Sequence, residues 1–125
     1  MTTPAADRGA AAVTGVMATV VALVLLLPSL VAVAGLLATA RSTRSAADAA
    51  ALAVLSGSPL AAGSGVPDTG AGHDLAAANG ARLVSVDPDG WPMEVSVTVT
   101  ARPAGVLGDL VGDLTAHATA RLVPP

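Results

Sequence analysis

Residues Gly9 to Ala40 read GAAAVTGVMATVVALVLLLPSLVAVAGLLATA, and this stretch decides the fold of the chain. It holds thirty-two residues without a charged side chain, between Asp7-Arg8 and Arg41. A helix rises about 1.5 Å per residue, so about 20 residues cross the hydrocarbon core of a bilayer. The stretch therefore predicts a membrane-spanning helix over Ala11 to about Leu37, with turns to spare. Pro28 lacks an amide hydrogen and predicts a bend inside this helix.

The composition favours a membrane protein and argues against several other classes. Of the 125 residues, 53% are hydrophobic, 1% aromatic and 12% charged; the net charge is −3 and lysine is absent. The basic stripe that nucleic-acid binding requires is therefore missing. Without cysteine the chain has no disulfide framework and no thiol nucleophile. We expect one small domain beside the apolar helix, no enzyme activity, no cofactor, and no nucleic-acid or small-molecule partner.

A cleaved signal peptide is the competing interpretation of the apolar stretch. Arg8 would form a short basic region, and Ala38-Thr39-Ala40 fits the small-x-small pattern of a cleavage site. The apolar core of a signal peptide spans about 7–15 residues, however, and this one is about twice as long. A retained membrane anchor is the favoured interpretation, and a protein released by cleavage near Ala40 is the alternative. Arginines on both sides of the stretch leave its orientation open.

The helix is expected to continue past the membrane to residue 56. Residues 41–55 contain neither glycine nor proline and are rich in alanine, the best helix former. Their charged side chains share one helical stripe, whereas another face carries Ala47, Ala50 and Ala51. A face of small residues lets a neighbouring helix approach closely, so these alanines are candidate helix-packing residues. A merely solvated juxtamembrane helix is the alternative.

The rest of the chain divides into a connector and a small head. Residues 57–72 hold five glycines and two prolines and predict a flexible linker. In residues 73–125, Asp74 is the expected cap of a short helix over 75–79, which Gly80 would close in left-handed geometry. With residues 1–10 as an N-terminal tail and 11–56 as the long helix, four segments are predicted.

Alternating apolar and polar residues predict three strands in the head, over 82–86, 93–100 and 116–122. The first two are joined by Asp87-Pro88-Asp89-Gly90, a turn in which the glycine is expected to take a positive φ. Residues 103–114 predict a loop or a weak helix. The expected fold class is α+β: a long N-terminal helix, then one short helix and a three-stranded antiparallel sheet.

The remaining polar residues do not predict a catalytic or metal site. His73 and His117 lack a third strong ligand for a metal, and Asp87 and Asp89 are explained by turn formation. Trp91, the one aromatic residue, either caps the sheet or presents a contact to a partner or a membrane surface.

Several short motifs carry a family resemblance. They are RGAAAVT (residues 8–14), SAADAAALA (45–53), AAANGARL (76–83), the alternation over 95–99, and residues 116–121. Together they resemble the TadE/TadG-like pseudopilins and minor pilins of tight-adherence (Flp) pili, and most closely the small TadE-like proteins of high-G+C Gram-positive bacteria. The resemblance covers most of the chain, from Asp7 to Leu122. It implies a single-pass membrane subunit with its head outside the cytoplasm and other pilus or secretion-system subunits as partners.

One departure from the family concerns processing of the N-terminus. Pilin-like precursors are cut after a glycine, and the fifth residue beyond it is usually Glu, which pairs with the new terminal amine of a neighbouring subunit. Here Gly9 is the candidate processing residue, and the fifth residue after it is Thr14. The chain also lacks the cysteine pair that many relatives carry in the head. We expect a structural subunit that acts by helix packing, with Gly9 or Ala40 as possible processing points.

Overall fold

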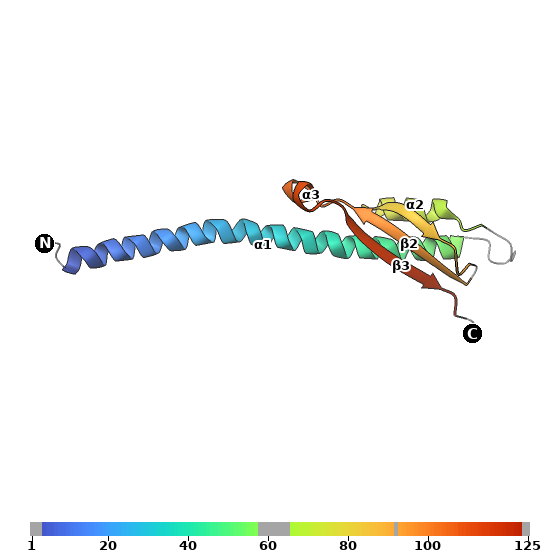
Figure 1. The fold of residues 1–125 in the computed structure, drawn as a ribbon, viewed down its shortest axis with the longest axis horizontal. Helices are drawn as coiled ribbons and strands as arrows, with labels where there is room; N and C mark the ends of the chain where they lie inside the picture. The colour runs from blue at the N-terminus through green and yellow to red at the C-terminus, as the bar shows by residue number, and fades with distance from the viewer. Residues whose placement is uncertain (1–3, 58–65, 92, 124–125) are drawn as a thin grey trace. The chain divides into compact units, whose positions relative to one another are not determined.

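The computed structural model describes residues 4–57, 66–91 and 93–123, and Figure 1 shows their arrangement. Three helices and three strands follow one another in the order α1 (Pro4–Gly57), α2 (Thr69–Ala78), β1 (Arg82–Asp87), β2 (Glu94–Ala101), α3 (Val106–Val111) and β3 (Leu114–Arg121). The predicted fold class is confirmed: a long apolar helix precedes a head with a short helix and a three-stranded antiparallel sheet. The sequence left the segment of α3 open between loop and helix.

Helix α1 is continuous over 54 residues and contributes to two compact units. Unit 1 is Met1–Ala34, and unit 2 is Gly35–Pro125. The helix starts at Pro4, so the predicted boundary between a tail at 1–10 and a helix at 11 is wrong; residues 1–3 lie outside the described residues. Proline suits the first turn of a helix because the amide hydrogen that it lacks would have no partner there. Pro28 lies inside α1 without ending it.

The sheet of unit 2 has the order β1-β2-β3, with both pairs antiparallel. The alternation predicted for β2 is confirmed, because Val95, Val97 and Val99 are buried while the residues between them are partly exposed. The register between β1 and β2 shifts between Leu83 and Ser85. Leu83 of β1 therefore faces the core together with the valines of β2, whereas Val84, at the register shift, is 55% exposed.

The core of unit 2 is built from small side chains shared between α1 and the apolar face of the sheet. Buried in one cluster are Ala46, Ala47, Ala50, Ala51, Val54 and Leu55 of α1, Ala76 of α2, Ala81 before β1, Leu83 of β1, Val95, Val97 and Val99 of β2, and Ala118 and Ala120 of β3. The predicted head of 73–125 is therefore too short. The part of α1 from Gly35 onward belongs to the same unit, because its alanines bury their surface with the strand valines.

Helix α2 differs from the prediction at its start. The carboxylate of Asp68 accepts hydrogen bonds from the amides of Gly70 and Ala71, at 3.0 and 3.3 Å, and caps a helix that begins at Thr69. Asp74 lies inside this helix, so the predicted cap is wrong, and the predicted linker of 57–72 overlaps the first turn of α2. Residues 58–65 of that linker lie outside the described residues. Gly80 follows with φ +74°, as predicted.

A close approach brings α2 against α1. A β-carbon placed on Gly72 would lie 2.5 Å from Cγ2 of Val54, 3.4 Å from the carbonyl oxygen of Ala50 and 3.6 Å from Cδ2 of Leu83. At the other end of α2, the hydroxyl of Ser42 donates to the carbonyl oxygen of Asn79 at 3.3 Å. The two helices therefore run antiparallel, and residue 72 must be glycine for the observed spacing.

The turn between β1 and β2 forms where it was predicted, with the amide of Trp91 donating to the carbonyl oxygen of Pro88 at 2.8 Å. The positive φ expected at Gly90 is wrong, since the described glycines with positive φ are at other positions. Glycine is needed there for space instead, because a β-carbon at this position would lie 2.5 Å from the β-carbon of Glu94. Trp91 is partly buried against the core, consistent with the capping of the sheet.

Candidate functional site

The apolar part of α1 is long and apolar enough to cross a membrane. Its most apolar 18-residue window has a mean hydropathy of 2.8, and no residue of that window is buried within the chain. In a protein surrounded by water, so much exposed leucine and valine would cost free energy in proportion to its area. The large apolar side chains exposed here, each at least 49% accessible, are Val13, Val16, Met17, Val20, Val21, Leu23, Val24, Leu25, Leu26, Leu27, Leu30, Val31 and Val33.

The hydroxyl groups of the apolar stretch all have partners inside the helix. Thr14, Thr19, Ser29 and Thr39 each donate to the carbonyl oxygen four residues earlier, at 2.8 to 3.0 Å. An unpaired hydroxyl costs several kcal/mol in hydrocarbon, at about 4–8 kcal/mol on transfer scales. The stretch therefore offers lipid an outer surface without unpaired side-chain hydroxyls.

Both candidate processing residues lie on exposed turns of α1. Gly9 has no atom within 4 Å of a β-carbon placed on it, and Ala40 is exposed. Both positions lie inside the continuous helix Pro4–Gly57, so making the backbone accessible for cleavage at either one requires local unwinding. Cleavage after Ala40 would leave residues 41–57 with the head, including every α1 residue of the buried cluster.

The alanine face of α1 is occupied by the chain itself. Ala47, Ala50 and Ala51, expected to meet a neighbouring helix of another subunit, are 0%, 0% and 1% exposed within this single chain. Helix α2 approaches this face at Ala50, because Gly72 lies against its carbonyl oxygen. The close helix approach predicted for this face is therefore found within the chain at Ala50, and small side chains are needed here so that α1 can pack beneath its own sheet. Sequence periodicity identifies such a face but does not identify its partner.

The titratable side chains of the head do not form a catalytic constellation. His73 lies on α2, on the side of the sheet covered by helices, whereas His117 lies on the polar face, where its Nδ1 is 2.8 Å from Oγ1 of Thr98. Among the described residues, no three His, Cys, Asp or Glu side chains gather as metal ligands would. Asp87 accepts a hydrogen bond from the amide of Asp89 at 3.1 Å, which is the turn-forming role predicted for this pair.

On the polar face of the sheet, side chains of β2 and β3 pair with each other across the two strands in what we call the polar ladder. Ser96 and Thr119 are paired at 2.8 Å across β2 and β3, and Nε of Arg121 lies 3.5 Å from Oε2 of Glu94. These partners stand directly opposite in the register of the two strands. Cross-strand pairs of this kind stabilise a sheet by about 0.2–1 kcal/mol each. The ladder explains the polar residues of β2 and β3 structurally.

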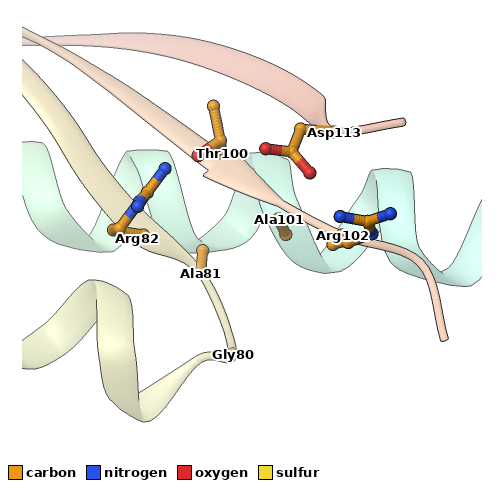
Figure 2. Close-up of a pocket in the computed structure, with 7 residues that line it drawn as sticks. All are labelled: Gly80, Ala81, Arg82, Thr100, Ala101, Arg102 and Asp113. Atoms are coloured by element: carbon orange, nitrogen blue, oxygen red, sulfur yellow. The ribbon is translucent and has the colours of Figure 1, made fainter. Parts of the chain in front are cut away.

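A hollow of about 420 Å³ lies at the end of the sheet where β1 begins and β2 ends. Figure 2 shows its lining, with Thr100 and Asp113 close to each other and the side chains of Arg82 and Arg102 on either side. Sequence analysis missed this grouping, because β1, β2 and the start of β3 meet only through the sheet register. Arg82 stands opposite Thr100 on β2, which stands opposite Thr115 on β3.

No family model matches the chain, and no curated protein and no solved structure is significantly similar to it.

Proposed function

We propose that this chain is a membrane-anchored structural subunit of the pseudopilin or minor-pilin type, acting in a tight-adherence pilus or a related secretion system. One observation carries the proposal: a single helix, α1, has an apolar part left exposed by the chain and a second part buried beneath a small sheet. The exposed part is suited to lipid or to like helices, and the buried part ties it to a folded head. The family resemblance of the sequence motifs supports the same function.

In the proposed mechanism the apolar part of α1 holds the subunit in the bilayer until assembly. On extraction, the same surface packs against α1 of other subunits, while the head is displayed outside the cytoplasm. The alanine face takes no part in this step, because it is already covered by α2 and the sheet. Assembly contacts are thus assigned to the exposed side chains of α1, such as Val24 and Val31, which are 63% and 72% accessible.

Single cysteines test the assembly step cleanly, because the native chain has no cysteine. We expect Val24→Cys or Val31→Cys to give disulfide-linked species with a second copy or a co-assembled subunit in membranes and pili. Asp48→Cys, on an exposed turn of the buried part of α1, is the matched control and should remain uncrosslinked. Absence of linked species at every exposed apolar position of α1 would reject assembly through this helix.

The mass of the mature chain separates the proposed anchor from the alternative, a small exported binding protein released near Ala40. An intact species, or one shortened by the nine residues through Gly9, in the membrane fraction supports the proposal. A species in the medium shortened by the forty residues through Ala40 contradicts it.

The proposed topology places residues 1–8 in the cytoplasm and the head outside. Val66 is 83% exposed and belongs to unit 2. A cysteine at this position should therefore react with a membrane-impermeant thiol reagent on intact cells. Reaction only after lysis would reverse the orientation.

A further inference from the structure

Helix α3 exposes most of its apolar surface, although it is part of the folded head. Val106 is 73% exposed, Leu110 is 77% exposed and Val111 is 48% exposed. Val106 and Leu110 are four residues apart, so they lie on the same side of the helix. Three of the four large apolar side chains of this six-residue helix are therefore left uncovered by the described residues, which makes them a candidate contact surface.

The local structure holds this apolar side outward. Gly108 is buried where α3 turns back on the end of β2, and a β-carbon there would collide with the carbonyl oxygen of Pro103. On the same helix, Asp109 accepts an ion-paired hydrogen bond from Nη2 of Arg102 at 3.0 Å. These contacts fix α3 against the segment that precedes it. The orientation of Val106 and Leu110 toward the outside is thus set by the fold.

Leu107, the fourth large apolar residue of α3, places the helix along α1. A β-carbon on Gly35 would lie 3.9 Å from Cδ1 of Leu107, which is ordinary van der Waals contact. Gly35 belongs to the charge-free stretch that ends at Ala40, and Leu37 beside it is 54% exposed. Leu107 of α3 therefore contacts the first residue of the α1 segment that belongs to unit 2, and this residue is part of the charge-free stretch.

The depth of this contact matches the boundary of a bilayer. Gly35 precedes Arg41, the first charged residue after the stretch, by six residues, or about 9 Å along a helix. The headgroup layer on each side of the hydrocarbon is about 5–8 Å thick. When Arg41 lies among the headgroups, Gly35 and the adjacent α3 lie near the start of the hydrocarbon. Interfacial helices bury their apolar side at this depth.

The charged side chains of unit 2 are unevenly distributed, with most arginines at the end that holds α3, where a phospholipid surface would favour them. Four of the five arginines in residues 35–125 lie toward the α3 end: Arg41 and Arg44 near the contact of Ser42 with Asn79, and Arg82 and Arg102 at the hollow. The opposite end of the sheet carries Asp87, Asp89 and Glu94, and Asp68 caps the start of α2. Two carboxylates also lie at the α3 end, Asp109 paired with Arg102 and Asp113 at the hollow, and the four arginines there outnumber them. This surplus of arginine would meet lipid phosphates.

We propose that α3 is a second membrane contact, which inserts Val106, Leu110 and Val111 into the interface of the bilayer that holds α1. This inference rests on the proposed membrane anchoring and adds a surface of the head to it. A second protein is a poorer occupant, since a stable protein interface buries about 800 Å² on each partner and α3 offers three side chains. With two contacts to the bilayer, the head lies in a fixed orientation on the membrane, and extraction of the subunit must detach both.

Tryptophan quenching by lipids tests the proposal, because Trp91 is the only native tryptophan. It lies in the turn before β2, at the end of the sheet opposite Arg102. Arg102 lies nine residue steps after Met93, with the eight residues of β2 between them, which corresponds to about 30 Å. The control is therefore the full-length wild-type chain. It is measured in vesicles of phosphatidylcholine and phosphatidylglycerol whose lipids carry bromine near the headgroup. We expect Trp91 to keep its emission there.

The test variants carry one new tryptophan each in a Trp91→Phe background. For Leu110→Trp and Val106→Trp, we expect the tryptophan to lose most of its emission in the same vesicles. For Leu26→Trp, we expect the same loss in vesicles brominated deep in the acyl chain. Both α3 positions are largely exposed, so a tryptophan is accommodated without repacking. Quenching of Leu26→Trp without quenching at either α3 position overturns the second contact and leaves the anchor standing. Lack of quenching at Leu26→Trp overturns the anchor and the inference together. Equal quenching of native Trp91 would show the whole head lying on lipid, which also contradicts the placement through α3.

Discussion

Substitution of Gly72 by alanine probes the contact that joins α2 to the buried part of α1. The new β-carbon would lie 2.5 Å from Cγ2 of Val54, closer than side chains tolerate, and Val54 is fully buried with a stiff β-branched side chain. Overpacking of this kind costs about 1–3 kcal/mol. Alanine also gains about 1 kcal/mol over glycine inside a helix. The two effects oppose each other, and we expect Gly72→Ala to lower the free energy of unfolding by roughly 0–2 kcal/mol.

A double-mutant cycle separates the two effects. Val54→Ala alone should lower the free energy of unfolding by about 2 kcal/mol, because two buried methyl groups are lost and a cavity remains. In that background the obstructing Cγ2 is gone, and the next neighbours of the new β-carbon are the carbonyl oxygen of Ala50 at 3.4 Å and Cδ2 of Leu83 at 3.6 Å. Gly72→Ala should then stabilise the protein by about 1 kcal/mol. The sign of its effect therefore reverses between backgrounds.

The assay is urea unfolding of the full-length chain in detergent, followed by the fluorescence of Trp91. This side chain packs against the core of unit 2, so its emission reports the unfolding of the head. The coupling energy between residues 54 and 72 is expected to be about 1–3 kcal/mol. If Gly72→Ala stabilised the chain by the same amount in both backgrounds, α2 would not approach α1 as described, and the argument would be refuted.

The other predictions concern the same fold and use the same unfolding assay or hydrogen exchange. Ala50→Leu should lower the free energy of unfolding by about 1–3 kcal/mol, because the residue is buried within the chain, whereas the exposed Ser45→Leu should change it by less than about 0.5 kcal/mol; equal effects would contradict the intramolecular packing. Asp68→Ala should cost about 1 kcal/mol through loss of the α2 cap, and Asp74→Ala much less; the reverse order would restore the cap predicted from sequence. Gly108→Ala should displace α3 from the segment holding Pro103 and speed amide exchange in α3, and unchanged exchange would contradict the close turn.

Helix α1 shows which structural features sequence patterns can predict and which they cannot. A charge-free stretch longer than a bilayer and an alanine-rich continuation are enough to predict one long helix, because both follow from local composition and helical rise. The bounds of the head were nevertheless wrong. A stretch of alanines has nearly the same helix propensity whether it faces water, a neighbouring subunit or its own sheet, and only the fold shows that Ala47, Ala50 and Ala51 are buried in their own chain.

The start of α2 and the role of Gly90 show a second limit. Asp68 and Asp74 are both followed by helix-compatible residues, and a cap depends on which carboxylate meets free amides in space. Gly90 was assigned a positive φ from a common turn type, but the position needs glycine for the approach of Glu94. Local rules identify that glycine is required and can still misassign the reason, because the reason lies in a neighbour that the turn brings close.

The sequence by itself determined the class of the fold, the apolar span and the polarity of the strands, because hydrophobic periodicity and segment length are properties of neighbouring residues along the chain. The tertiary structure alone decided which residues distant in the sequence come into contact. It brought Arg82 and Arg102 to the same hollow through strand register, closed α2 onto α1 at Gly72, and set Leu107 of α3 against Gly35. These pairs are separated by 18 to 72 residues in the sequence, so no local pattern relates them, and their meeting depends on the packing of small side chains in one shared core.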